Sequence, residues 1–204
     1  MRVLPCGESA VLAEVDDLEQ AMALHAAVQA NPPPGAVDLV PAARTLLVRF
    51  SRGTTSAGEV AAYLRSVRPV AQAGEGSEDA VVIEVTYDGP DLADVAELTG
   101  LSEQQIVDLH TAGDWTVAFT GFAPGFGYLV GGDPRLHVSR RSESRTRVPA
   151  GSVGLAGEFT GAYPRESPGG WQLIGRTSAT LWDVDRDPPA LLVPGIRVRF
   201  EAVG

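Results

Sequence analysis

Lysine is absent from this 204-residue chain, because all 16 of its basic residues are arginines. A Walker A loop needs a lysine on the nucleotide phosphates, and a Schiff base, a biotin or a lipoate needs a lysine amine. The chain can therefore carry none of these groups itself. Any lysine or biotin chemistry in its function would have to come from a partner chain.

Cysteine is almost as scarce, since Cys6 is the sole one. A single cysteine excludes an internal disulfide and a cysteine-based zinc site, and it favours a reducing cytoplasm. The histidines His25, His110 and His137 show no metal-ligand spacing, so we expect no bound metal. The sequence has no apolar run of about 18 residues to span a membrane, and residues 1–10 do not resemble a signal peptide.

Acidic residues outnumber basic ones by 26 to 16, which argues against nucleic acid or an anionic membrane as a partner. Residues 69–134 contain twelve acidic residues and no arginine, whereas residues 135–199 contain ten arginines. The densest cluster comprises Arg135, Arg140, Arg141, Arg145 and Arg147. Two interpretations stay open. The arginines form a solvated face or pair with the acidic segment, or they form an anion site in which guanidinium groups bind carboxylate or phosphate.

The first part of the chain has the pattern of a small α/β sandwich, which we place at residues 1–72. Periodicity and turn residues predict strands at 2–4, 9–15, 37–41 and 45–50, and helices at 18–30 and 54–67. Asp16 or Asp17 caps the first helix, and a run of prolines ends it. The polar, aperiodic residues 71–79 then indicate a linker, which we place at 73–80.

Residues 81–204 have a different pattern, with many short apolar runs between glycine and proline turns. We expect strands at 81–87, 115–120, 153–156, 171–174, 179–182, 191–193 and 197–200. Two short helices at 91–99 and 102–110 begin at capping residues, Asp91 and Ser102, and Gln105 completes a capping box with Ser102. Closely spaced short strands predict a β-barrel or a sandwich.

Three loops of this part contain candidate binding residues. In the first loop, Phe122, Pro124, Gly125, Phe126 and Tyr128 suit the wall of a pocket, although by chemistry alone a barrel corner with Phe122 and Phe126 in the core is favoured. The second loop holds Gly151 and Ser152, whose backbone amides suit an anion nest; we expect Ser152 to contact a ligand rather than act as a nucleophile. The third turn ends in Trp171, whose simplest interpretation is a residue that plugs the barrel, and Thr177 follows its strand.

His110 ends the helix that precedes the strand leading to the first loop. A histidine at a helix C-terminus is favoured by the helix dipole alone. From this position the imidazole could also reach a pocket at the end of that strand and act as an acid or a base. Both interpretations stay open from the residues.

Taken in order, the loops resemble the allophanate hydrolase subunit 1 / kinase A inhibitor family, whose members are largely described as B-type subunits of 5-oxoprolinase. The resemblance covers nearly the whole chain. It rests on Gly7-Glu8-Ser9-Ala10, Asp91-Leu92, His110, Gly121-Phe122-x-Pro124-Gly125-Phe126-x-Tyr128-Leu129, Arg140-Arg141-x-x-x-Arg145-x-x-Val148-Pro149-Ala150-Gly151-Ser152-Val153, Tyr163-Pro164, Pro168-Gly169-Gly170-Trp171-x-Leu173-Ile174-Gly175-x-Thr177 and Pro194-Gly195-Ile196-Arg197-Val198-Arg199-Phe200. The chain departs from the family at Ser139 and Ser144, where proline is usual, at Phe159, where glutamine is usual, and at Ile196, where aspartate is usual.

The resemblance implies an α+β N-terminal domain followed by a cyclophilin-like β-barrel C-terminal domain. It implies the B-type subunit of an ATP-dependent 5-oxoprolinase that opens 5-oxo-L-proline to L-glutamate. Such a chain is active only in a heteromer with the C-type subunit, which is the allophanate hydrolase subunit 2 homologue, and with the A-type subunit. ATP is then a co-substrate of the complex, and this chain binds no metal or biotin. Two alternatives are a carboxyl-transfer partner in a urea carboxylase or allophanate pathway, and a binding module that inhibits a histidine kinase.

The same resemblance places the site in the second domain. Opening a lactam that carries a carboxylate calls for arginine and backbone N–H donors. We expect His110 and Arg145 to be catalytic, His110 as acid or base and Arg145 on the anion. The expected substrate- or anion-binding residues are Phe122, Pro124, Gly125, Phe126, Tyr128, Arg140, Arg141, Gly151, Ser152, Trp171 and Thr177.

Overall fold

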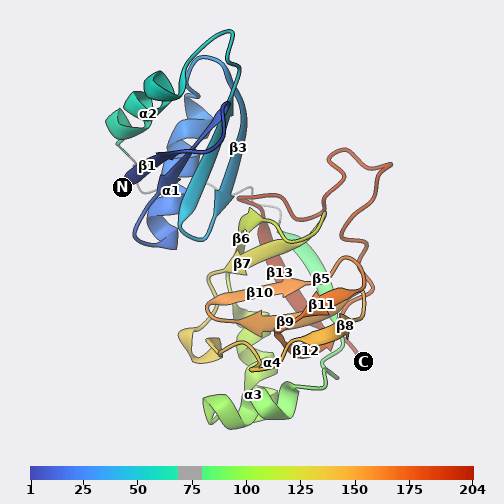
Figure 1. Cartoon of the computed structure of the whole chain (residues 1–204). Helices are drawn as coiled ribbons and strands as arrows, with labels where there is room; N and C mark the ends of the chain where they lie inside the picture. Colours follow the sequence, from blue (N-terminus) through green and yellow to red (C-terminus); the bar gives the residue numbers. More distant parts are fainter. Residues whose placement is uncertain (69–79) are drawn as a thin grey trace. The chain divides into compact units, whose positions relative to one another are not determined.

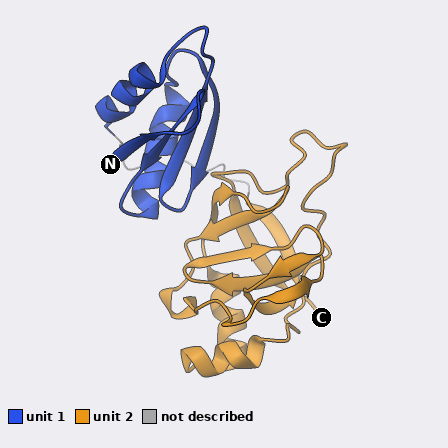
Figure 2. Cartoon of the chain, in the orientation of Figure 1, with its two compact units in different colours: residues 1–75 blue, residues 76–204 orange. Residues whose placement is uncertain are grey.

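The computed structural model describes residues 1–68 and 80–204 (Figure 1). The chain divides into two compact units, residues 1–75 and 76–204, shown in blue and orange in Figure 2. The division between the units falls outside the described residues, and so does nearly all of the expected linker at 73–80. The exact extent of the linker therefore stays a prediction.

The first unit is an antiparallel four-stranded sheet with two helices, as the sequence pattern predicts. The strand order is β1-β2-β4-β3, with bounds β1 (Arg2–Pro5), β2 (Ala10–Glu14), β3 (Ala36–Ala42) and β4 (Thr45–Phe50). Helix α1 (Leu18–Ala30) packs on β3 and β4, and α2 (Ala57–Ser66) packs on β1 and β2. Both helices contribute to one apolar core with the sheet, which includes Leu24, Leu46 and Leu64.

Helix starts in this unit follow their capping residues. The Asp17 carboxylate accepts a hydrogen bond from the Gln20 amide at 2.8 Å, as predicted for one of the two aspartates. Helix α2 begins at Ala57 rather than at Thr54, because Ser56 and Glu59 form a capping box that fixes its first turn.

The second unit is built on a seven-stranded sheet of order β12-β9-β10-β7-β6-β13-β5. The bounds are β5 (Val81–Val85), β6 (Trp115–Thr120), β7 (Gly127–Val130), β9 (Ser152–Ala156), β10 (Phe159–Ala162), β12 (Gln172–Arg176) and β13 (Arg197–Ala202). A bridge between Thr86, just after β5, and Arg176, in β12, connects the two edges of the sheet. The sheet is therefore barrel-like and nearly closed, and the fold is mixed α/β.

Smaller elements surround this barrel. Helices α3 (Leu92–Thr99) and α4 (Glu103–Ala112) lie at one end in Figure 1, and β8 (Arg145–Val148) pairs with β11 (Ser167–Gly169). A short 3-10 turn, η1, covers Pro134–Leu136. The capping box of Ser102 and Gln105 at the start of α4 is confirmed. None of the helices in the described residues is both long and apolar enough to cross a membrane.

Two of the expected strands are wrong. Residues 179–182 and 191–193 lie outside the strands, and a single bridge between Trp182 and Ala190 marks this region. Pro188 and Pro189 lack an N–H to donate, so the segment between the two runs cannot extend a ladder. Sequence reasoning also missed β7, β10 and β11, which contain glycine or proline as turns do, and β8, a short run with two arginines.

Candidate functional site

A cavity of about 170 Å³ opens on the second unit beside the β8–β11 pair. Its walls are mainly aromatic, with one arginine and one serine among the polar groups. The lining residues are Phe122, Phe126, Tyr128, Arg140, Ser144, Tyr163, Pro168, Gly169 and Trp171. The ring of Phe126 lies nearly perpendicular to Trp171 at 5.3 Å and to Tyr163 at 5.2 Å, which are favourable edge-to-face arrangements. The cavity thus borders a rigid aromatic cluster.

The loop before β7 brings Phe122 to the edge of this cavity. Phe122 has φ +67°, a left-handed conformation that costs energy for a residue with a side chain, and 58% of it is exposed. Phe126, in contrast, is 1% exposed. The favoured prediction of a barrel corner with both rings in the core is therefore right for Phe126 and wrong for Phe122. Gly125 is required in this loop, because a Cβ there would lie 2.9 Å from Cβ of Trp182.

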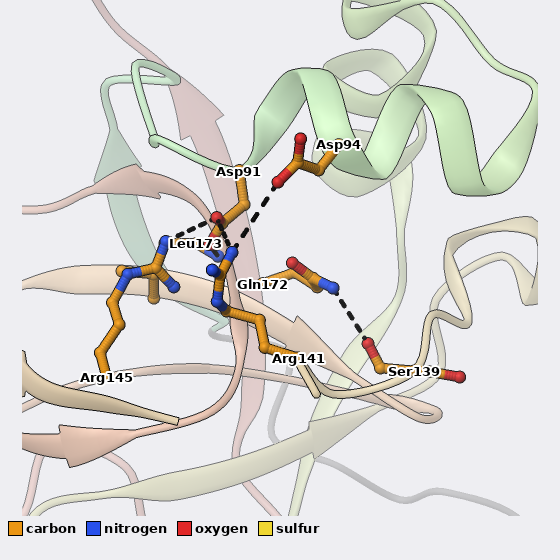
Figure 3. Close-up of polar contacts among 7 residues, drawn as sticks. All are labelled: Asp91, Asp94, Ser139, Arg141, Arg145, Gln172 and Leu173. Carbon is orange, nitrogen blue, oxygen red and sulfur yellow. Dashed lines mark hydrogen bonds and ion pairs between the residues drawn. The ribbon is translucent and has the colours of Figure 1, made fainter. Parts of the chain in front are cut away.

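Arg141 and Arg145 point toward one buried carboxylate (Figure 3). Asp91 Oδ1 accepts hydrogen bonds from Arg141 Nη1 at 2.7 Å and from Arg145 Nη2 at 2.6 Å. The second oxygen, Oδ2, accepts from the Leu173 amide at 2.7 Å, and the Asp91 side chain is 1% exposed. Asp91 occupies the N-cap position of α3, as predicted, but its side chain makes no capping hydrogen bond to the helix. Its charge instead pairs with the arginine segment.

Three atoms of this buried cluster have no hydrogen-bond partner among the described residues: Arg141 Nε, Arg145 Nη1 and Gln172 Oε1. The other end of the Gln172 amide donates from Nε2 to the Ser139 carbonyl at 3.2 Å (Figure 3). Two guanidinium groups share the single buried carboxylate, and Asp94 adds a longer, exposed contact to Arg141 at 3.8 Å. Two donors and one acceptor of the cluster are therefore left without a partner among the described residues.

The remaining arginines of the predicted cluster divide into two groups. Arg135 pairs with Asp133 and Arg147 pairs with Glu166, both at the surface. Arg140 is exposed, lines the cavity and forms no ion pair with any described residue. Three of the five arginines, Arg135, Arg141 and Arg145, thus pair with the acidic segment, whereas the partner of Arg147 lies outside it. Within the described part of the chain, Arg140 differs from them in presenting its guanidinium to the cavity.

The charge of Arg140 acts on two tyrosine hydroxyls. Burial raises the pKa of both Tyr128 and Tyr163, and the nearby Arg140 guanidinium opposes that rise in each case. For Tyr163, a hydrogen bond from the Trp171 backbone N–H to the hydroxyl oxygen also lowers the pKa. Both hydroxyls thus stay protonated at neutral pH in a positive local field.

His110 lies in the core and not at the cavity. Its side chain is fully buried, with Nδ1 2.7 Å from the Tyr87 hydroxyl and Nε2 2.8 Å from Thr160 Oγ1. Because Thr160 Oγ1 donates to the Gly154 carbonyl at 3.2 Å, it accepts from Nε2–H, and the Tyr87 hydroxyl then donates to Nδ1. Desolvation lowers the pKa of His110 to about 3, so the ring is neutral at physiological pH. Its surroundings are those of a structural histidine.

The Gly151–Ser152 loop has its backbone donors already satisfied. The Gly151 N–H donates to the Tyr163 carbonyl at 2.7 Å, and the Ser152 N–H donates to the Pro149 carbonyl at 3.3 Å. The Thr177 N–H donates to the Gly151 carbonyl, and a Cβ on Gly151 would lie 2.3 Å from the Thr177 carbonyl oxygen. These residues tie β12 to the β9 turn, and an anion nest is not formed there.

The structure therefore gathers part of the predicted site. Five expected residues line the cavity: Phe122, Phe126, Tyr128, Arg140 and Trp171. Eight expected residues are not in its lining: Pro124, Gly125, Arg141, Arg145, Gly151, Ser152, Thr177 and His110. Four lining residues were missed: Ser144, Tyr163, Pro168 and Gly169. The last three lie in motifs that carry the resemblance and could have been chosen from it, whereas Ser144 stands at a departure from the family. The described residues contain no group of three or more side chains suited to holding a metal.

The comparisons with known proteins agree on the family. The model for "Carboxyltransferase domain, subdomain C and D" matches residues 1–192. The B-type subunit of 5-oxoprolinase from Escherichia coli O157:H7 is 44% identical over 82% of this chain and 78% of that protein. Its counterpart from Bacillus subtilis, which bears the same name, is 38% identical over 87% of this chain and 81% of that protein. Part of the Saccharomyces cerevisiae urea amidolyase is 32% identical over 53% of this chain and 6% of that protein.

Two solved structures share the fold. The crystal structure of TTHA0988 has a TM-score of 0.79 and 36% identity, and the match covers 97% of this chain and 41% of that one. The urea amidolyase of K. lactis has a TM-score of 0.72 at 20% identity, over 100% of this chain and 16% of that one. The family model and the relatives together show that the chain belongs to the family of carboxyltransferase domains, subdomains C and D, that includes the B-type subunits of 5-oxoprolinase.

Proposed function

We propose that this chain is the B-type subunit of an ATP-dependent 5-oxoprolinase complex, which opens 5-oxo-L-proline to L-glutamate. The observation that carries the proposal is the identity of 44% and 38%, over most of the chain, to two proteins of that name. The complex would also contain the C-type subunit, the allophanate hydrolase subunit 2 homologue, and the A-type subunit. In this proposal the nearly closed sheet of the second unit is a cyclophilin-like barrel.

The cavity supports this function chemically. 5-Oxoproline is a small ring with one apolar edge, a lactam amide and a carboxylate. Aromatic walls such as Phe126 and Trp171 suit the ring, and the Arg140 guanidinium at the edge suits the carboxylate. Two protonated hydroxyls, those of Tyr128 and Tyr163, provide neutral donors beside the ring.

The reaction also needs activation of a stable amide. ATP can supply it by transferring its γ-phosphoryl group to the lactam oxygen, which releases ADP. Water then attacks the activated carbon, and the ring C–N bond breaks as the nitrogen takes up a proton. A second water hydrolyses the resulting acyl phosphate, which releases phosphate and leaves the side-chain carboxylate of glutamate. The phosphates of ATP require cationic and N–H donors, and this chain has no lysine and no Walker A loop. We therefore assign the binding and orientation of the lactam to this chain, and ATP binding to a site completed by its partner subunits.

The test is reconstitution. The chain is co-expressed with C-type and A-type subunits from the same organism, and glutamate release from 5-oxo-L-proline is measured with and without ATP. We expect release from the full set only, and none from this chain alone, from the set lacking this chain or without ATP. A demonstrably assembled complex that releases no glutamate would overturn the proposal.

A second function is favoured by one observation, the carboxyltransferase name of the family together with the match to part of a urea amidolyase. In that function the chain would be the carboxyl-transfer partner of a biotin enzyme in a urea carboxylase or allophanate pathway. The biotin would come from another chain, since this one has no lysine to carry it. Transfer of labelled carboxyl from carboxybiotin to urea by the assembled complex, without glutamate release, would favour it over the first.

A further inference from the structure

The segment from Ser139 to Arg145 has two faces. Arg141 and Arg145 direct their guanidinium groups to the buried Asp91 carboxylate (Figure 3). Their sequence neighbours Arg140 and Ser144 instead line the aromatic cavity. Arg141 is thus next in the chain to Arg140, and Arg145 is next to Ser144. Because the two anchored arginines are held by Asp91, the backbone of their two neighbours is held at the cavity.

The backbone of the same segment is also fixed independently of the cavity residues. The Ser139 carbonyl accepts from Gln172 Nε2, and the Arg141 N–H donates to the Gly170 carbonyl at 2.8 Å. At its end, Arg145 lies opposite Gly169 in the β8–β11 pair. None of these contacts uses the side chain of Arg140 or Ser144, and both are left accessible to a ligand.

Arg140 and Ser144 converge beside the wall formed by Trp171. A Cβ built on Gly170 would lie 2.8 Å from Ser144 Oγ and 3.8 Å from Arg140 Nε, so both side chains pass close to one point of the backbone. A guanidinium and a hydroxyl are both donors to a carboxylate, and neither has a carboxylate partner among the described residues.

We propose that Arg140 and Ser144 form a carboxylate subsite at the edge of the aromatic cavity, and that Asp91 positions them through Arg141 and Arg145. The ligand class is a small acid with one carboxylate and a mainly apolar ring. The proposal rests on the proposed function, in which 5-oxo-L-proline is that acid. Asp91 itself is a positioning residue, because it does not line the cavity.

Binding to the full chain tests the subsite directly by calorimetry. The probes are 5-oxo-L-proline, cyclopentanecarboxylate, which keeps the carboxylate but not the lactam, and 2-pyrrolidinone, which keeps the lactam but not the carboxylate. We expect both acids to bind about tenfold or more tightly than 2-pyrrolidinone, the size of a charge-assisted hydrogen-bond pair. Equal affinities, or no saturable binding of any probe, would overturn the subsite.

Variants assign the preference to the two residues. Arg140→Gln is expected to remove the preference for acids, and Ser144→Ala to reduce it about threefold to tenfold. Arg147→Gln is the matched control, because Arg147 lies in β8 near the same segment but pairs at the surface with Glu166. A preference unchanged by Arg140→Gln, or equally reduced by Arg147→Gln, would contradict the assignment.

The positioning role has its own readout. Asp91→Asn keeps an oxygen for the Leu173 amide but removes the charge that holds the two arginines. We expect weaker binding of 5-oxo-L-proline, about tenfold, with unchanged binding of 2-pyrrolidinone. A merely structural role would weaken both probes together, and that result would contradict the positioning role.

Gly170→Ala gives a second test if Asp91→Asn fails to fold. The added methyl group would meet the Ser144 hydroxyl at 2.8 Å and displace it, while Asp91 and its partners stay unchanged. The preference for acids should fall as it does in Ser144→Ala, and an unchanged preference would count against Ser144.

Failure of the proposed function and failure of the subsite give different results. Acid-selective binding without glutamate release overturns only the proposed function. Glutamate release that Arg140→Gln does not affect overturns only the subsite.

Discussion

His110 and Asp91 are two buried polar side chains of the second unit, and their hydrogen-bonding atoms find partners of opposite kinds. His110 is neutral and shares its two ring nitrogens between the hydroxyls of Tyr87 and Thr160. Asp91 is surrounded by two guanidinium groups and a backbone N–H. Neutral partners satisfy the histidine completely, whereas the cluster of Asp91 contains atoms that have no partner in the described part of the chain.

The difference separates a purely structural network from one that bears on binding. The hydrogen bonds of His110 connect α4 to β10 and to a residue that follows β5, and none of these residues lines the cavity. The ion pairs of Asp91 connect the start of α3 to the segment that contains Arg140 and Ser144. A buried charge of this kind can fix long arginine side chains, because the guanidinium group forms strong, directional pairs with a carboxylate.

The largest effect should follow from removing the buried carboxylate. Asp91→Ala leaves two guanidinium groups partly buried without their acceptor, and we expect the free energy of unfolding to fall by about 3–5 kcal/mol. Urea denaturation of the full chain measures it. Asp94→Ala is the control, because Asp94 is exposed and 3.8 Å from Arg141, and it should cost less than about 1 kcal/mol. Equal losses in the two variants would show that burial of the pair does not matter.

The neutral histidine should give a pH dependence instead. The pKa of His110 is about 3 in the folded chain and about 6.5 when unfolded, so below pH 6.5 the unfolded state binds a proton that the folded state does not. Stability is then complete above pH 6.5 and falls by about 1.4 kcal/mol per pH unit toward pH 3. We expect His110→Phe to lose this slope in urea titrations between pH 7 and 4.5. Half-buried His25, whose pKa is also lowered, contributes equally to both proteins. Parallel profiles would contradict a buried neutral His110.

A smaller effect is expected at the strained loop. Phe122→Gly relieves the strain of the left-handed backbone at φ +67°, which stabilises the folded state. The same change raises the conformational entropy of the unfolded chain, which opposes that gain, so the free energy of unfolding should change by less than about 1 kcal/mol. The same change removes an aromatic wall of the cavity, and it should weaken binding of cyclopentanecarboxylate severalfold. Thermal unfolding measures the effect on stability, and binding calorimetry on the same preparation measures the effect on the affinity for cyclopentanecarboxylate. A large loss of stability would show that Phe122 packs more tightly than its exposure indicates.

The smallest effect should come from a surface ion pair. Arg147 and Glu166 are both exposed, so Arg147→Gln should lower the free energy of unfolding by at most about 0.5 kcal/mol. Raising the salt concentration to about 1 M should remove even that difference. A loss comparable with that of Asp91→Ala would erase the distinction between buried and exposed arginines.

Local patterns predicted most of the regular structure. The helices and strands of the first unit, and the capping box at Ser102, follow from periodicity and from the residues at helix starts. Asp91 shows the limit of that reasoning, because an aspartate before a helix suggests a cap, while its real partners lie about 50 residues away in sequence. The glycine-rich strands β7 and β10 were missed for a similar reason, since pairing rather than composition makes them strands.

The site was predicted only in part for the same physical reason. The aromatic residues and Arg140 were selected because the motifs placed them together, and they do line one cavity. Whether an arginine faces a cavity or a buried carboxylate depends on tertiary contacts, so the sequence singled out Arg145 for the anion although Arg140 is the one that lines the cavity. Ser144 was noted as a departure from the family, but a serine in a polar loop is ordinary and was not selected as a ligand contact. His110 was expected to react because of its position, whereas its partners leave it neutral and enclosed.

The most direct test of the two-faced segment is the KM of the assembled complex for 5-oxo-L-proline in the Arg140→Gln variant. The account predicts a KM raised about tenfold or more, with kcat and the KM for ATP nearly unchanged, because the subsite binds the carboxylate equally in the ground and transition states. The Arg147→Gln complex should match the unaltered one. An unchanged KM in Arg140→Gln, measured in a complex that turns over, would contradict the account.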